Sequence, residues 1–488
     1  MSEKNLSQKI INGMKWKTIE RVSLQIVNAV TPIFLARLLT PDDFGIIAIL
    51  SVFISLANTF VNNGLTNSIV QKKDSDNLDC STVYYTQFTI SVVCYFVLFL
   101  AAPYIAHFYN SNELTLMLRV MSLSLVIGAF GAMQITILKK RMMFHKSFFA
   151  TISGTVSYGV VGILCAYNGL GCWSLIYAAL AQSTALSLIN IMIIKWRPDF
   201  AFSLKRLKNL FSYSWKLTVG WLIGTIHQDL YTLIIGKRFN SATLGYYNRA
   251  GSFPQIFHKT IIEVVDGVMF PALSSIQDEK ERFKNMARTL LSMNSFLIFP
   301  VFFGLSAITK PLIIFLLTDK WLMSVDMMRI VCITYSLTTL NHSNMQIFNS
   351  IGRSDIFMKF ELFKRTISII LLFITSFINI YAVISVLLLM SVMSNLMNSY
   401  QNNKLIGYSY KEQLKDILPS LVSAFITAVM VFLISTALEN IISSLIIVLI
   451  IDVLSGAGIY VAISFVINRK TILNFIDILK SFLKKKKA

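Results

Sequence analysis

Apolar runs of about 20 residues or more recur from one end of this 488-residue chain to the other, and each is long enough to cross a bilayer as a helix. Only 14% of the residues are charged and the mean hydropathy is +0.65, which is too apolar for a soluble globular protein. We therefore predict an all-α polytopic membrane protein. About fourteen transmembrane helices are expected, near residues 16–39, 44–69, 80–105, 115–138, 147–168, 171–194, 211–236, 245–273, 286–309, 325–351, 356–379, 381–402, 415–438 and 441–467.

Short polar turns separate these apolar runs. The first, "ARLLTPDDFG" at residues 36–45, places Pro41 and an Asp pair between two spans. Proline cannot continue the first helix, the two carboxylates are costly in lipid, and Thr40 or Asp42 can cap the helix that follows. This stretch is thus predicted to be a tight turn outside the membrane.

The net charge of +20 follows the positive-inside pattern. Most Lys and Arg residues fall at the two termini or near the even-numbered turns, so both termini are expected to be cytoplasmic. No basic, aromatic-interleaved domain lies outside the spans, and we expect no nucleic-acid binding. The exceptions, expected outside or within the membrane, are Arg37, Arg119, Lys237, Arg238, Arg249, Lys259, Lys310, Lys320 and Arg329.

No motif indicates catalysis, a metal or a cofactor. The chain lacks a Walker A loop, an HExxH element and a GxSxG element. Its five cysteines are scattered through apolar segments without a CxxC pair, which favours small buried hydrophobes. Cys165 and Cys172 flank one short external turn, and the sequence leaves open whether they form a disulfide.

A faint internal repeat at an offset of about 200 residues indicates two six-helix halves of the same orientation, although chance similarity between apolar helices is the alternative. It aligns Trp16 with Trp215, Arg37 with Lys237 and Gly45 with Gly245. Transporters built from such repeats bind their substrate between the halves, near the bilayer midplane. The predicted division is an N-lobe at 1–194, an amphipathic cytoplasmic linker at 195–210, a C-lobe at 211–402, a linker with the last helix pair at 403–467, and a basic tail at 468–488.

The tail has an amphipathic pattern that ends in four lysines. This pattern suits an interfacial helix on anionic lipid, and a solvated tail that merely obeys the positive-inside rule is the alternative. Its apolar face would consist of Ile472, Phe475, Ile476, Leu479 and Leu483.

Polar residues at helical spacing mark the faces that turn toward water or protein. The first two helices of each half carry such faces, and the simplest geometry has these four helices facing one another across a wet cavity. The faces are Thr18, Arg21, Gln25, Asn28 and Thr31; Ser51, Ser55, Asn58, Asn62 and Thr66; Thr218, Thr225, Gln228, Asp229 and Thr232; and Asn248, Arg249, Ser252, Gln255, Lys259, Glu263 and Asp266.

The Ser and Thr positions are also explained by hydrogen bonds between helices. The charged positions are not explained in this way, because inserting a charge at the bilayer centre costs about 2.5–3.5 kcal/mol of free energy, so the charge needs water or a partner. Lys259 and Glu263 are spaced to pair with each other. His227 lies on the face opposite Asp229 and is predicted to pack between helices, whereas the role of His258 is left open.

These faces supply the candidate site. Basic groups suit a phosphate- or carboxylate-bearing cargo, and buried carboxylates can host a coupling H⁺ or Na⁺. The predicted substrate-binding residues are Arg21, Gln25, Asn28, Asn58, Asn62, Gln228, Arg249, Gln255 and Lys259, with Arg21 near the cytoplasmic mouth; the predicted coupling residues are Asp229, Glu263 and Asp266.

Several turn motifs together resemble one transporter family. They are "ARLLTPDDFGIIAI", "KKRMMFHKSF", "YNGLGCWSLIYAAL", "WRPDFAFSL", "LIIGKRFNSATLGYYNRAGSFP" and "MFPALSSIQDEKERFKNMA". In this order they are similar to the Wzx-type flippases, the polysaccharide-transport branch of the multidrug/oligosaccharidyl-lipid/polysaccharide exporter superfamily. From about residue 300 onward the resemblance depends on helix count and hydropathy.

The resemblance implies fourteen helices in two lobes that form a MATE/MurJ-like V. It also implies that the protein moves undecaprenyl-pyrophosphate-linked oligosaccharide repeat units across the bacterial inner membrane by alternating access, for lipopolysaccharide, capsule or exopolysaccharide synthesis. Membrane lipid and the glycan polymerase machinery are the expected partners. No functional residue is carried over, because the family has no universal catalytic signature.

Other functions stay open at this stage. Cation-coupled multidrug export would favour an acidic cavity, and the basic excess on the polar faces argues against it. Peptidoglycan-precursor flipping is a second alternative within transport. A glycan polymerase or ligase typically needs an extended external loop, and the longest one expected here, about residues 310–325, is too short. A membrane scaffold would have no reason to maintain four polar helical faces.

Overall fold

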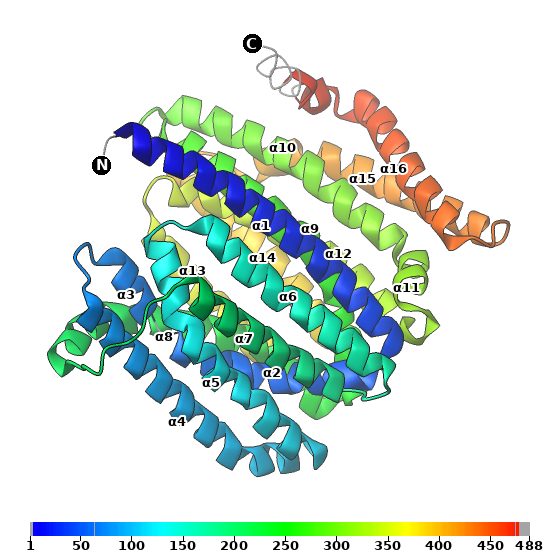
Figure 1. Cartoon of the computed structure of the whole chain (residues 1–488). Helices are drawn as coiled ribbons and strands as arrows, with labels where there is room; N and C mark the ends of the chain where they lie inside the picture. Colours follow the sequence, from blue (N-terminus) through cyan, green and yellow to red (C-terminus); the bar gives the residue numbers. More distant parts are fainter. Residues whose placement is uncertain (1–2, 63, 474, 478–488) are drawn as a thin grey trace. The chain divides into compact units, whose positions relative to one another are not determined.

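The computed structural model describes residues 3–62, 64–473 and 475–477, and in this part of the chain it contains helices and no strands. Helices are expected for lipid-embedded segments, because a helix satisfies its backbone hydrogen bonds internally. In chain order (Figure 1) they are α1 Glu3–Leu38, α2 Pro41–Val61, α3 Leu65–Gln71, α4 Asn77–Tyr109, α5 Glu113–Lys140, α6 Phe144–Tyr167, α7 Trp173–Ile193, α8 Leu204–Arg238, α9 Ser241–Ser274, α10 Lys280–Ala307, α11 Thr309–Leu317, η1 Asp319–Trp321, α12 Ser324–Asn349, α13 Ser354–Thr375, α14 Ile380–Ile406, α15 Tyr410–Glu439 and α16 Leu445–Ile467.

Each of the fourteen predicted spans coincides with a long helix of the described chain. The second span is interrupted, because α2 ends at Val61 and the short helix α3 begins at Leu65. Ten helical stretches among the described residues are long and apolar enough to cross a membrane by length and composition. The long helices α8, α9, α12 and α13 are not among the ten, and each carries charged or amide side chains within its length.

The predicted first turn is confirmed, and its cap is Thr40. The Thr40 hydroxyl accepts a hydrogen bond from the Asp43 amide at 3.3 Å, and the Asp43 carboxylate accepts one from the Thr40 amide at 2.8 Å. Pro41 occupies the first position of α2, where its missing N–H is not needed. This reciprocal capping box fixes where α2 begins.

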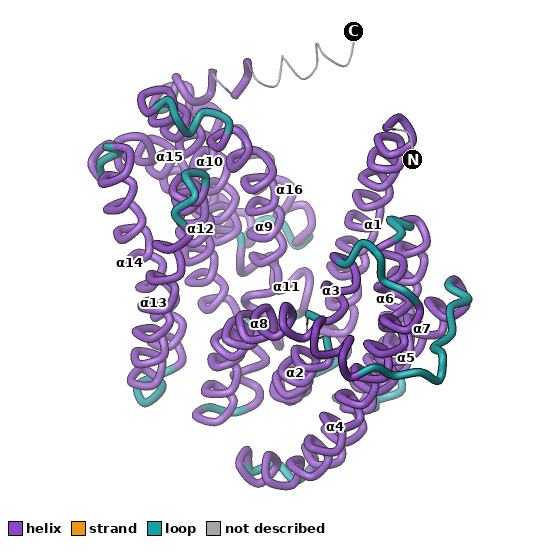
Figure 2. The backbone as a smooth tube through the Cα atoms, turned by 90° about the vertical axis from the view of Figure 1, so that its left-hand side faces the viewer, coloured by secondary structure: helices purple, strands orange, loops and turns teal. Residues whose placement is uncertain are grey.

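The chain forms two compact units, Met1–Gly245 and Tyr246–Ala488. In the first unit α6 packs against α1 and α7, and α5 packs against α4 and α7 (Figure 2). Gly159 on α6 allows the close approach of α1, since an added Cβ atom would lie 2.9 Å from the Thr31 hydroxyl. Leu50, Leu98, Leu118 and neighbouring residues form an apolar core between α2, α4 and α5.

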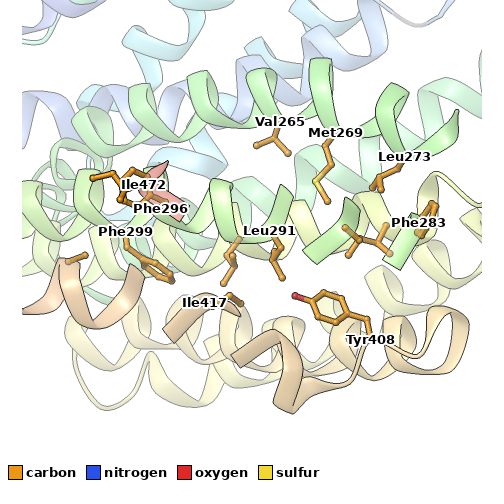
Figure 3. Packing of buried hydrophobic residues seen from close by; sticks show 14 of the residues in the cluster. Val265, Met269, Leu273, Phe283, Leu291, Phe296, Phe299, Tyr408, Ile417 and Ile472 are labelled. Carbon is orange, nitrogen blue, oxygen red and sulfur yellow. The ribbon is translucent and has the colours of Figure 1, made fainter. Parts of the chain in front are cut away.

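The core of the second unit joins α9, α10, α15 and the chain after α16. Met269 of α9, Leu291 and Phe299 of α10 and Ile417 of α15 belong to one buried cluster, which also contains Tyr408 (Figure 3). The Tyr460 hydroxyl of α16 donates to the Phe296 carbonyl at 2.8 Å. This packing explains why the "MFPALSSIQDEKERFKNMA" motif is apolar at regular positions, because its Met269, Leu273, Ile276, Phe283 and Ala287 are all buried there.

The segment predicted as a linker at 195–210 is an extended stretch followed by the first turns of α8. It is held on the amino-terminal end of α4. The Trp196 indole donates to Asn77 at 2.5 Å, the Asp199 amide donates to the Ser81 hydroxyl at 2.9 Å, and Arg206 pairs with Asp76 and Asp79. The "WRPDFAFSL" motif thus has a structural role, because its polar groups fix the start of α8 to α4.

Two further features concern the predicted divisions of the chain. Helix α8 packs with α2, α3 and α4 in the first unit, so the boundary of the compact units falls after it, whereas the predicted lobe boundary precedes it.

In the tail, Ile472 is buried and Phe475 and Ile476 pack against the core of the second unit. Leu479 and Leu483 lie outside the described residues. The lobe division and the lipid-facing tail remain predictions.

Candidate functional site

In the first unit the polar faces of α2 and α8 meet directly. The Ser55 hydroxyl on α2 donates a 2.8 Å hydrogen bond to the Asp229 carboxylate on α8. One turn away, the Thr59 and Thr225 hydroxyls are 3.4 Å apart. A half-buried carboxylate is therefore held between two helices by hydroxyl groups, and the polar stripes predicted for these two helices do face each other.

The other predicted residues of the first unit lie on α1, α2 and α8. On α1, Arg21 and Asn28 are exposed and Gln25 is half-buried. On α2, Asn58 is half-buried and Asn62 is exposed at the end of the helix. Gln228 on α8 is exposed. His227 is half-buried, and its ring packs edge-to-face on Tyr231 one turn further along α8, with ring centroids 6.4 Å apart. Its packing between helices stays a prediction.

In the second unit Asp266 is the centre of a polar cluster between α9 and α12. Its carboxylate accepts hydrogen bonds from His342 Nε2 at 2.7 Å and from Gln346 Nε2 at 2.5 Å. His342 and Gln346 are themselves one helical turn apart, with their Nε2 atoms separated by 3.3 Å. A carboxylate beside an imidazole can hold a proton at either group, so this arrangement is chemically suited to reversible protonation.

The remaining charged residues of α9 take different positions. Lys259 and Glu263 are exposed, whereas Arg249 and Gln255 are half-buried. His258, whose role the sequence left open, is packed: its Nδ1 atom is 2.8 Å from the Thr339 hydroxyl, and its ring stacks on Tyr335 with centroids 4.5 Å apart. His258 therefore fastens α9 to α12, and Arg249 and Lys259 remain candidates for binding substrate.

Sequence reasoning missed the polar contribution of α12 and α14. Asn398 donates to the Asn341 side chain at 2.6 Å, and Asn341 donates to the Ser394 hydroxyl at 3.0 Å. The Ser394 hydroxyl also accepts from Lys364 on α13 at 2.9 Å. The signal was present in the sequence, because Ser, Thr and Asn recur at a spacing of three or four in "SLTTLNHSNMQ" and "SVMSNLMNSYQNN".

No group of three or more His, Cys, Asp or Glu side chains that could hold a metal ion occurs within the described residues. The five cysteines are free thiols, including Cys165 and Cys172, and the Cys172 sulfur lies 3.5 Å from the sulfur of Met117. The groups at the two carboxylate clusters can form hydrogen bonds and exchange protons.

Together, the many membrane-length helices and the polar faces inside them define a membrane transporter. The profile of the family described as "Polysaccharide biosynthesis protein" matches residues 34–326, which is more than half of the chain. The protein belongs to this polysaccharide biosynthesis family.

Two relatives with descriptive names are similar along most of the chain. The lipopolysaccharide biosynthesis protein WzxC of Escherichia coli strain K12 is 24% identical over 366 residues, covering 74% of each chain. The succinoglycan biosynthesis transport protein ExoT of Rhizobium meliloti strain 1021 is 22% identical over 356 residues, covering 73% of this chain and 72% of the relative.

A solved structure confirms the fold class. The lipid II flippase MurJ in an inward closed conformation superposes with a TM-score of 0.72 and 14% sequence identity, covering 95% of this chain and 100% of MurJ. At this identity the likeness establishes the fold alone. The described part of the chain is thus all-helical with the fold of this flippase, which confirms the all-α, multi-span membrane fold class predicted from the helix pattern. The likeness to MurJ was implied by the family resemblance.

Proposed function

We propose that this protein is a flippase that moves lipid-linked oligosaccharide repeat units across the bacterial inner membrane during polysaccharide synthesis. Membership of the polysaccharide biosynthesis family carries the proposal. It is supported by the names of WzxC and ExoT, which place these relatives in lipopolysaccharide biosynthesis and in succinoglycan biosynthesis and transport, and by the fold shared with MurJ. The product of such a protein is a relocated lipid, so no catalytic residue is assigned and the protein is proposed not to be an enzyme.

The polar faces give this function a physical basis. Moving a glycan through a bilayer requires groups that replace the water hydrogen bonds of its hydroxyls, since unsatisfied polar groups in hydrocarbon cost several kcal/mol. Hydroxyl and amide side chains on α1, α2, α8 and α9 can do so, with Gln25, Asn28, Asn58, Asn62, Gln228 and Gln255 as the proposed contacts. The lipid-linked glycan is therefore the proposed ligand of these faces.

Cations on α1 and α9 are proposed to bind the charged part of the substrate. Lys259 is exposed on α9 and Arg249 lies nearly three turns before it. Arginine and lysine side chains bind phosphate or carboxylate oxygens with charge-assisted hydrogen bonds. We assign Arg249 and Lys259 to the phosphate or to an acidic sugar, and Arg21 to the pyrophosphate near the cytoplasmic mouth.

Energy coupling is proposed for the carboxylates. Asp266 is bonded to His342 and Gln346, and Asp229 is bonded to Ser55; within the described residues these partners are neutral or titratable. Either site can therefore change charge when an H⁺ binds, and Asp266 together with the exposed Glu263 could also attract Na⁺. Both termini in the cytoplasm, alternating access and association with the glycan polymerase complete the proposal.

The deciding experiment follows the lipid-linked glycan in cells that lack the protein. Inner-membrane vesicles are prepared from the deletion strain, and the glycan in each leaflet is labelled with an impermeant reagent. Accumulation of one polyprenyl-linked repeat unit on the inner leaflet, reversed by the intact gene, is the expected result. An unchanged glycan pool combined with new sensitivity to cationic drugs would instead support drug export.

A further inference from the structure

A cavity of about 470 Å³ lies in the second unit, away from the polar faces of α9 and α12. It is lined by residues 285–293 of α10, by residues 415–419 of α15 and by the chain that follows α16, three segments that also lie together in Figure 1. Its polar lining includes Asn285, Arg288, Lys415, Asp416, Asn468, Arg469, Lys470 and Thr471.

The lining is strongly basic, with four cationic side chains against one carboxylate. The carboxylate of Asp416 is already engaged: Arg288 binds it through two nitrogens at 2.7 and 2.9 Å, and the Tyr408 hydroxyl donates to it at 2.8 Å. Burial and this nearby carboxylate raise the pKa of Tyr408, so its hydroxyl remains a donor. The Arg288–Asp416 pair is therefore a neutral part of the wall.

Three cations remain after that pair is set aside. Lys415, Arg469 and Lys470 are exposed, and no ion pair joins them to a carboxylate within the described ranges. Their backbone is nevertheless fixed, because the buried Asn468 donates to the Ser420 hydroxyl at 2.8 Å and Ile472 is packed into the core. The cavity thus presents a positive surface of defined shape that lacks its counter-charge.

Exposed apolar side chains flank the basic lining residues along the sequence of two helices. Leu414 and Leu418 of α15 and Phe465 and Val466 of α16 are exposed large hydrophobic residues next to lining positions in the sequence. A ligand that fits both surfaces has an anionic head and hydrocarbon chains. Basic pockets between transmembrane helices on the cytoplasmic side are known to bind anionic lipid head groups.

We propose that this cavity binds the phosphate head group of an anionic membrane phospholipid, with Lys415, Arg469 and Lys470 as the phosphate-binding residues. The lipid holds α10, α15 and the chain after α16 together from the membrane surface. This site is separate from the proposed substrate faces and does not depend on the proposed function. A phosphate group could also come from a polyprenyl phosphate or from free phosphate, and the test distinguishes these sources.

The test measures lipid retained by the purified full-length protein. Wild-type protein and the Lys415→Gln/Lys470→Gln variant are mixed with phosphatidylglycerol, phosphatidylcholine or a polyprenyl phosphate and examined by native mass spectrometry. Lys404→Gln/Lys411→Gln is the matched control, because these two exposed lysines lie at the ends of α14 and α15 outside the cavity.

We expect phosphatidylglycerol to be retained over phosphatidylcholine, and about tenfold less of it to remain on the cavity variant than on the control. Retention that is equal for wild type and cavity variant would overturn the site. Selective retention of the polyprenyl phosphate would overturn the phospholipid assignment and make the cavity a substrate site. Displacement of phosphatidylglycerol by equimolar inorganic phosphate would show that the apolar surface contributes nothing, and would overturn the lipid as ligand.

Discussion

Gly45 of α2 and Gly245 of α9 make reciprocal contacts with the first residues of each other's helices. A Cβ atom added to Gly45 would lie 1.7 Å from the carbonyl oxygen of Ser241, and one added to Gly245 would lie 1.8 Å from the carbonyl oxygen of Pro41. The Ser241 hydroxyl also donates to the Asp42 carboxylate. All of these residues belong to the first unit, and the two glycines are the pair that the internal repeat aligned.

This contact predicts that neither glycine tolerates a side chain. Gly45→Ala or Gly245→Ala must push two backbones apart, and overpacking of this kind costs about 1–3 kcal/mol, or more where backbone has to move. We expect a lower thermal unfolding temperature and less folded protein in the membrane. Gly251→Ala is the control, because an added Cβ atom there meets nothing within 4 Å. Equal stability of Gly45→Ala and Gly251→Ala would refute the interlock.

Asp266 is expected to be required for transport but not for folding. Asp266→Asn keeps the shape of the side chain and removes the titratable group next to His342. If proton binding at this cluster drives transport, glycan flux should fall by about a hundredfold or more, the range typical of a lost proton-transfer group. Flux is measured as outer-leaflet glycan in cells expressing equal amounts of each protein.

The control for Asp266 makes the same chemical change elsewhere. Asp278→Asn alters an exposed carboxylate beyond the end of α9 and should leave flux unchanged. His342→Gln tests the partner, since it retains a hydrogen-bond donor without the imidazole. Normal flux from either Asp266→Asn or His342→Gln would exclude proton coupling at this cluster.

Lys259 is expected to contribute to substrate binding. Because its side chain is exposed, Lys259→Ala removes a charge without opening a cavity, and the amount of folded protein should stay the same. Loss of one charge-assisted contact to phosphate should weaken substrate binding by about 1.5–3 kcal/mol, and glycan flux should fall at limiting substrate. Lys404→Ala provides the comparison. Wild-type flux from well-expressed Lys259→Ala would rule out this role.

Arg206 should stabilise the junction between the linker and α4. It bonds to Asp76 and lies 3.2 Å from Asp79, a fully buried carboxylate that also pairs with Lys72 at 2.5 Å. Replacing Arg206 by Gln leaves Asp79 with Lys72 as its remaining cation, and should lower the free energy of unfolding because a buried carboxylate loses a charge-assisted hydrogen bond. Denaturation of purified protein measures this. Lys205→Gln, an exposed neighbour, should have no effect.

The same junction should be sensitive to acid. The Arg206 guanidinium, as the main cause, and the Asp79 backbone amide lower the pKa of Asp76 from 3.8 to about 2. A lowered pKa means that the Asp76 carboxylate stabilises the fold above pH 3.8 and loses this contribution as the pH falls toward 2. The stability difference between wild type and Arg206→Gln should therefore shrink across that interval, as followed by thermal unfolding at several pH values. A constant difference would mean that Asp76 does not contribute.

The sequence alone determined the fold class and the helices of this protein. Lipid forces each buried backbone group to bond within its own helix, so a membrane span is visible as an uninterrupted apolar run without knowledge of its neighbours. The same local reasoning located the Thr40–Asp43 turn, the polar stripes of α2, α8 and α9, and the aligned glycines Gly45 and Gly245.

Only the tertiary structure decided which polar residues meet. Helical spacing shows that Asp229 and Asp266 lie on polar faces, but it does not identify their partners. Asp229 binds Ser55 of α2, and Asp266 binds His342 and Gln346 of α12, a helix not included in the predicted site. Such contacts depend on the rotation and depth of each helix against its neighbours, which side-chain packing sets. For the same reason the basic cavity around Lys415 and Lys470 could not be read from the chain, because three separate segments have to come together to form it.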